Sequence, residues 1–296
     1  MHEKYPKLRR YMTNGLLILR EGLVLTFFIR RPHREISTSV LRALELYCHT
    51  VGLEKLGWYT HANGDLQPLD TEGWELIHDK LRSENGWPVD LWESVDQLGG
   101  YRFEYRGRAL GTDSYIHRPD AVCGASFWLP TEYLEEQGPA RVKELAVALA
   151  RELPLSTGYA SLAFNTLSDE LGIDRILHEL SFRYPGLDIP DIGITLRIGT
   201  RPKGAYWLNF YGQPMLGELG GMAGLRERLS LPEVSIQELE GDKVLVALGE
   251  WPDVEGEMRP YRKLARVLEP YLYQETVRWS GFPPEEMRRW ERRFLG

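Results

Sequence analysis

Short runs of β-forming residues alternate along this chain with segments whose apolar residues recur at helical spacing. Tyr101–Arg106 alternates aromatic and charged residues, which is the pattern of a half-buried strand. After Pro139, the residues Val142, Leu145 and Leu149 form one apolar stripe of an expected helix. This mixture predicts an α+β fold with a mixed, mostly antiparallel sheet and helices packed on it.

Two stretches share the order strand, helix, strand, and they predict repeated modules that lie side by side. The first has strands at Ala125–Leu129 and Tyr159–Phe164, with the helix that follows Pro139 between them. The second has strands at Ala205–Tyr211 and Ser235–Leu239, with a helix at Met222–Leu229 between them. We expect the whole chain to form a single domain, residues 1–296.

Two shorter patterns predict further strands. Leu16–Leu19 and Leu23–Ile29 are β-rich runs, and the Glu21-Gly22 pair between them predicts a hairpin that closes there. Ile194–Ile198 is also rich in β-branched residues and predicts a strand.

The formal net charge of the 296 residues is −7, and one segment accounts for all of it. Ala62–Leu98 carries nine Asp or Glu residues and only two Lys or Arg residues. Proteins that bind nucleic acid usually present a basic face, so the acidic balance argues against direct nucleic-acid binding. Complementary charge speeds association, so an acidic chain is suited to a basic partner.

The acidic segment also contains Trp74, Trp87 and Trp92, and two interpretations of it remain open. In one, a pair of solvated helices packs its tryptophans inward; Trp74, Ile77 and Leu81 suit one face of such a helix. In the other, the segment is an acidic, aromatic binding face.

The two cysteines, Cys48 and Cys123, have apolar flanks and form no Cys-x-x-Cys pair, which predicts two reduced, buried thiols. The first residues, Met1–Thr13, lack the apolar run of a signal peptide. No segment approaches the roughly 20 apolar residues of a membrane span. We therefore expect a cytoplasmic protein that does not enter the membrane.

The ordinary signatures of enzymes are absent from the sequence. No Glu-x-Lys of a restriction-type nuclease occurs, and the seven histidines form no metal-binding pair. No Gly-x-Ser-x-Gly elbow is present. The glycines of Gly217–Gly224 match no phosphate-binding loop. We therefore expect no catalytic residues, no metal ligands and no cofactor.

From Gly100 onward the chain contains six strings that occur together in one bacterial family. They are Gly100–Phe103, Ser126–Leu134, Phe182–Asp191, Trp207–Pro214, Leu216–Gly221 and Trp290–Leu295. On these strings the chain resembles the type VI secretion immunity family, which was first catalogued as a domain of unknown function. Members of that family neutralise nuclease effectors of the VRR-Nuc kind. The resemblance is strong over residues 100–296 and looser over residues 1–99.

The resemblance implies a non-enzymatic immunity protein that occludes a cognate type VI effector toxin, most simply a nuclease. It transfers no catalytic residue to this sequence. Two alternatives remain: another protein-interaction or regulatory role, and an enzyme with a non-standard site. A homodimer is compatible with each of these functions.

A nuclease holds phosphates in a basic cleft, so its inhibitor is expected to present carboxylates and aromatic anchors. Three regions supply candidate partner-binding residues: the acidic segment, a Pro-rich loop, and a loop before the glycine cluster. The candidates are Asp90, Trp92, Glu93 and Asp96 in the first region, Asp188 and Asp191 in the second, and Tyr211 and Gln213 in the third.

Overall fold

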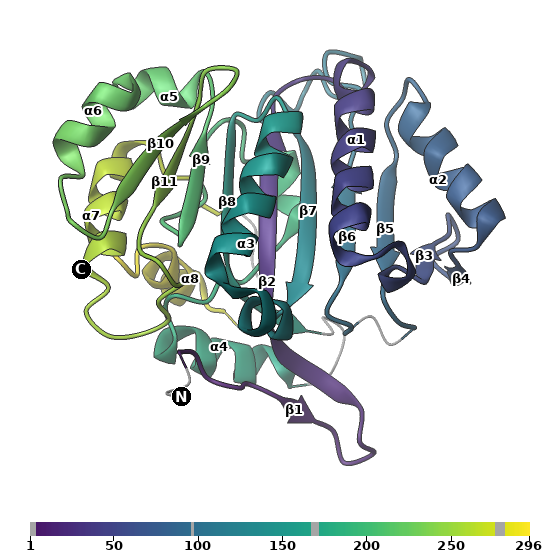
Figure 1. The fold of residues 1–296 in the computed structure, drawn as a ribbon, viewed down its shortest axis with the longest axis horizontal. Coiled ribbons are helices and arrows are strands. Elements are labelled where there is room, and N and C mark those ends of the chain that lie inside the picture. Colours follow the sequence, from purple (N-terminus) through teal and green to yellow (C-terminus); the bar gives the residue numbers. More distant parts are fainter. Residues whose placement is uncertain (1–3, 96–97, 167–171, 276–281) are drawn as a thin grey trace.

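The computed structural model describes residues 4–95, 98–166, 172–275 and 282–296. Within them, eleven strands form one open antiparallel sheet (Figure 1). The order across the sheet is β10-β11-β9-β8-β2-β7-β6-β5-β3-β4, and β1 pairs with β2. The strands are β1 Arg10–Tyr11, β2 Leu17–Ile29, β3 Trp58–Thr60, β4 Leu66–Pro68, β5 Pro88–Trp92, β6 Arg102–Arg106, β7 Cys123–Pro130, β8 Thr157–Thr166, β9 Leu208–Tyr211, β10 Ser235–Leu239 and β11 Lys243–Ala247.

Helices cover both faces of this sheet. In Figure 1, α1 and α3 lie in front of its middle, while α7 and α8 lie behind the side formed by β9, β10 and β11. The helices are α1 His33–Val51, α2 Thr71–Arg82, α3 Thr131–Glu152, α4 Ile173–Arg183, α5 Met215–Glu218, α6 Gly221–Arg228, α7 Arg259–Leu268 and α8 Pro284–Glu291. Three short 3₁₀ helices are η1 Leu53–Lys55, η2 Ile192–Leu196 and η3 Glu269–Tyr271.

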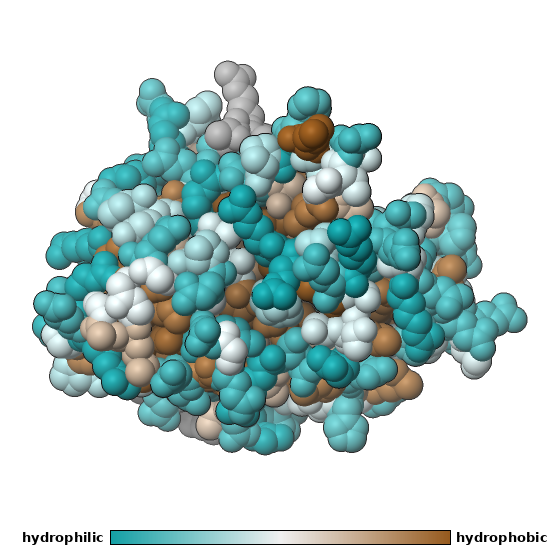
Figure 2. Space-filling model, turned by 90° about the horizontal axis from the view of Figure 1, so that it is seen from above, coloured by the Kyte–Doolittle hydropathy of each residue, from teal (hydrophilic) through white to brown (hydrophobic). Residues whose placement is uncertain are grey.

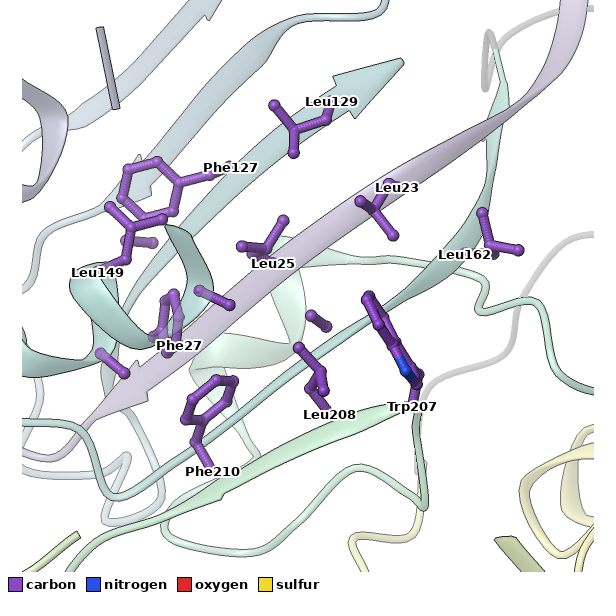
Figure 3. Packing of buried hydrophobic residues seen from close by; sticks show 14 of the residues in the cluster. Leu23, Leu25, Phe27, Phe127, Leu129, Leu149, Leu162, Trp207, Leu208 and Phe210 are labelled. Carbon is purple, nitrogen blue, oxygen red and sulfur yellow. The ribbon is translucent and has the colours of Figure 1, made fainter. Parts of the chain in front are cut away.

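The main core lies between the sheet and the helices α1 and α3. Alternate residues of β2 point into it, and Figure 3 shows Leu23, Leu25 and Phe27 packing with residues from neighbouring strands and from α3. The Phe27 ring meets Phe210 edge-on, with ring centroids 5.4 Å apart. Because strand side chains alternate between faces, the residues between these point to the opposite face of the sheet.

The expected hairpin at Glu21-Gly22 is wrong, because β2 runs without a break through both residues. Glu21 is only 1% exposed and sits in the strand because its carboxylate is well paired. It accepts hydrogen bonds from the Leu8 amide at 2.8 Å and from the Thr131 hydroxyl at 3.3 Å. Gly22 leaves room for a neighbouring ring, because a Cβ there would make a tight contact of 3.3 Å with Trp128.

The expected strand at Ile194–Ile198 is also wrong, since most of this segment forms η2. The Asp191 carboxylate accepts a hydrogen bond from the Gly193 amide at 2.7 Å and so starts the helical turn. The turn packs directly on β7, where a Cβ at Gly124 would lie 2.5 Å from the Thr195 methyl group. The Asp191 cap and the close approach of η2 to β7 therefore favour a helical turn over a strand here.

The α+β class and the predominantly antiparallel sheet are confirmed. The repeated modules are not confirmed. Strands β7 and β8 flank β2 and are joined by α3, a 22-residue segment kinked at Gly138. Strands β9 and β10 flank β11, but their connection contains two short helices, α5 of four residues and α6 of eight. The acidic segment likewise contains one helix, α2, followed by strand β5 rather than by a second helix.

Candidate functional site

The face of the sheet that points away from α1 and α3 carries a row of charged and aromatic side chains on β5, β6 and β7. Strand register places Asp90 opposite Glu104 and Glu104 opposite Ser126. One step along the strands, Trp92 lies opposite Arg102 and Arg102 opposite Trp128. We call this set, completed by Arg106, the polar sheet face: Asp90, Trp92, Arg102, Glu104, Arg106, Ser126 and Trp128.

Arg102 is the centre of the polar sheet face. Its guanidinium carbon lies 4.1 Å from the Trp128 ring centroid and 4.9 Å from that of Trp92. The Trp128 indole N–H donates to Oε2 of Glu104 at 2.8 Å, and Nε of Arg102 lies 3.5 Å from the same oxygen. Burial lowers the pKa of Arg102, but a guanidinium stays protonated, so the group remains a cation.

Asp90 and Trp92, both candidates from the sequence, are held in place on this face. Nη1 of Arg106 donates to Oδ1 of Asp90 at 2.7 Å. Burial raises the pKa of Asp90, and the neighbouring Arg106 opposes that effect. The Trp92 indole N–H donates to the Thr60 hydroxyl at 2.9 Å. Both side chains are half-buried, so part of each remains available to a partner.

A polar cavity of about 230 Å³ opens beside Arg102, between the sheet and the beginning of η2. The Thr26 and Ser126 hydroxyls, 2.8 Å apart, line it from β2 and β7. Arg102 and Glu104 line it from β6. Asp191 lines it from the segment that leads into η2. Trp92 stacks on Arg102, which lines the cavity together with Asp191. Two sequence candidates from different regions therefore lie at one site.

Asp188 lies deeper and is fully buried. Nζ of Lys203 donates to both of its oxygens, at 2.8 and 2.7 Å. The Tyr159 and Tyr206 hydroxyls donate to it as well, at 2.7 and 2.9 Å, and their rings stack with centroids 4.0 Å apart. Burial lowers the pKa of Lys203, while the Asp188 carboxylate opposes this. Asp188 therefore does not face a partner; it holds Tyr159, which lines the cavity.

Three other sequence candidates, Glu93, Tyr211 and Gln213, do not line the cavity. Oε2 of Glu93 accepts from the Gly100 and Tyr101 amides and so closes the loop after β5. Tyr211 is buried, and its hydroxyl has no hydrogen-bond partner among the described residues. Gln213 is exposed and accepts from the Gly217 amide at 3.3 Å. Asp96 lies outside the described residues.

Sequence reasoning missed Arg102, Glu104, Ser126 and Trp128 as site residues. The alternation within Tyr101–Arg106 did mark Arg102 and Glu104 as facing away from the core. Trp128 gave no such signal, because it sits in an apolar run whose eight residues, β7, are all buried. Only the pairing of β7 with β6 places its indole against Arg102.

Helices α2 and α7 lie at opposite ends of the sheet (Figure 1), and their exposed side chains carry charge of opposite sign. On α2, Glu72, Glu75 and Asp79 are exposed at a spacing that puts them on one side. On α7, four basic residues line a hollow of about 620 Å³: Arg259, Arg262, Lys263 and Arg266. Within the described part of the chain, none of these seven side chains forms an ion pair. From above, Figure 2 shows mostly hydrophilic residues with hydrophobic ones scattered among them.

Residues 4–95, 98–166, 172–275 and 282–296 contain no group of three or more His, Cys, Asp or Glu side chains placed to hold a metal ion. In the same ranges no helix combines the length and the apolar character that crossing a membrane requires. Both cysteines are buried and unpaired.

Comparison with known proteins gives a match to a protein family and matches to solved structures. A family model described as type VI immunity for VRR-NUC matches residues 39–294. Among solved structures, a T6SS protein of Pseudomonas aeruginosa superposes with a TM-score of 0.79 at 18% sequence identity, covering 99% of this chain and 88% of that one. At this identity the likeness shows a shared fold. No curated protein matches this sequence.

Proposed function

This chain belongs to the type VI immunity family for VRR-NUC, and we propose that it binds a cognate type VI effector nuclease and covers the surface with which that nuclease holds nucleic acid. Membership in the family is the observation that carries the proposal. The protein acts in the cytoplasm, where an incoming effector would reach the cell's own nucleic acid. It acts by occupancy alone, without a chemical step and without contacting nucleic acid itself.

The polar sheet face supports this proposal because it has the make-up of a protein interface. Trp and Arg are the residues most enriched among those that dominate binding energy. Here Trp92, Arg102 and Trp128 stack on one another on rigid strands. Side chains that are already ordered lose little entropy when a partner arrives, so more of the contact energy remains as affinity.

The charge distribution also supports it. A nuclease must neutralise phosphates, so its substrate surface is basic. This chain has a net charge of −7, and the acids of α2 are exposed without an ion pair in the described structure. Their field would draw a basic effector toward the protein and raise the association rate.

Co-expression tests the proposal. The chain is produced together with the product of the gene immediately upstream, which is taken as the effector, and growth is compared with that of cells that make the effector alone. We expect growth to be restored and the two proteins to co-purify in a 1:1 ratio. The control is the same experiment with an unrelated nuclease toxin, which should stay lethal.

Three results would contradict the proposal. A soluble, abundant chain that leaves the upstream effector lethal would exclude an immunity function toward it. Protection at amounts of the chain far below those of the effector would indicate catalysis and favour the enzymatic alternative. Co-purification without any protection would favour a regulatory interaction.

A further inference from the structure

Among the described residues that line the cavity beside Arg102, carboxylates outnumber cations. Two carboxylates face it, Glu104 and Asp191, along with the hydroxyls of Thr26 and Ser126. Arg102 is the one cation among the described lining residues, and it is already held between two indole rings and beside Glu104. Among the described lining residues, two carboxylates therefore stand against one cation.

Both carboxylates keep an oxygen available. Within the described structure, the hydrogen bond to Glu104 from Trp128 uses Oε2 only. Asp191 uses Oδ1 to accept from the Gly193 amide, while its Oδ2 forms a long ion pair with the Arg197 guanidinium, at 3.9 Å, which is too far for a hydrogen bond. Each carboxylate is thus fixed through one oxygen and can receive a donor on the other.

From these contacts we infer that the cavity receives one basic side chain, a lysine or an arginine, from the surface of the effector. The inference rests on the proposed function and names the point of contact within it. The guest's cationic end pairs with Glu104 and Asp191, and the Thr26 and Ser126 hydroxyls accept further hydrogen bonds from it. Its methylene stem lies against the Trp128 ring.

An acidic guest fits the cavity less well. It would meet two carboxylates and compete with Glu104 for Arg102. A basic guest leaves the existing contacts in place and adds charge-assisted hydrogen bonds, which are stronger than neutral ones. Such a guest is also what a surface that holds phosphates would offer.

The first test compares two variants with the same change in net charge. Glu104→Gln keeps the shape of the side chain and an oxygen for Trp128 but removes the charge from the cavity. Glu238→Gln is the matched control, because Glu238 is an exposed strand residue on β10, at the far edge of the sheet. Dissociation from the upstream-encoded effector is measured for the full-length chain, and we expect it to be about tenfold faster for Glu104→Gln and unchanged for Glu238→Gln.

The second test does not depend on the effector. N-acetyl-arginine amide is titrated into the full-length chain, and the indole N–H resonance of Trp128 is followed by NMR, assigned by its loss in Trp128→Phe. We expect a saturable shift that N-acetyl-glutamine amide does not produce and that Glu104→Gln abolishes.

The outcomes test the cation preference of the cavity and the proposed function separately. If the wild-type chain fails to protect against the effector yet shows the saturable arginine shift, the proposed function is wrong, whereas the preference of the cavity for a cation stands. If the chain protects but the Glu104→Gln, Asp191→Asn double variant dissociates like the wild type, the cavity inference is overturned. An equal shift with both amides, or a shift with N-acetyl-glutamate alone, would overturn it as well.

Discussion

Nζ of Lys203 lies 2.7 Å from Oδ2 of Asp188, and both side chains are buried behind the cavity. Asp188 also exchanges backbone hydrogen bonds with β8, through Phe164 and Leu162. The pair therefore fixes the segment that leads to Asp191 against the sheet. The position of one cavity wall depends on it.

Removing one partner of this pair should destabilise the fold strongly. Lys203→Met leaves the Asp188 carboxylate buried without its counter-ion, which costs about 3–5 kcal/mol. Urea unfolding measures the loss. The exposed Lys263→Met on α7 is the control and should change stability by less than about 0.5 kcal/mol. Equal midpoints for the two variants would show that the buried pair contributes nothing.

Trp128→Phe should loosen the polar sheet face while keeping the core side of β7 intact. The change removes the indole N–H that holds Glu104 and weakens the contact with Arg102, with an expected loss of about 1 kcal/mol. It should also speed dissociation of the effector complex. Trp87→Phe, at an indole that is half exposed, is the matched control. Identical unfolding curves for both would argue against an ordered stack.

Reversing the exposed acids of α2 should slow association. In Glu72→Lys, Glu75→Lys, Asp79→Lys, the attraction toward a basic effector is replaced by repulsion, and the association rate should fall on the order of tenfold at low salt. Since salt screens exposed charges, the difference from wild type should shrink as ionic strength rises. Stopped-flow mixing measures both. A change confined to the dissociation rate would instead indicate that α2 lies within the interface with the effector.

Neither cysteine should react while the protein is folded. Burial raises the pKa of Cys48 to about 12 and that of Cys123 to about 11, and the thiolate is the reactive form. A colorimetric disulfide reagent at pH 8 should therefore detect no thiol in the native protein and two in denaturant. Rapid labelling of one thiol before unfolding would contradict the burial of that residue.

Elements set by local pattern were predictable from the sequence. The hairpin of Ser235–Leu239 and Lys243–Ala247 follows from two strand-length runs on either side of the turn Glu240-Gly241-Asp242. Helix α4 follows from its amphipathic spacing and the Tyr184-Pro185-Gly186 stop. The expectations at Glu21-Gly22 and Ile194–Ile198 failed because distant residues, Leu8, Thr131 and Gly124, decide the local conformation there.

By itself, the sequence determined the α+β class, the concentration of acid in one segment and the membership in an immunity family. These depend on composition, on periodicity and on strings of adjacent residues. The tertiary structure alone decided that Trp92 stacks on Arg102 and that Asp191 lines the cavity beside it, whereas Asp188 is buried among tyrosines. Periodicity encodes which side of a strand faces the core, but the order of strands in a sheet is fixed by long-range packing, and that order creates the cavity.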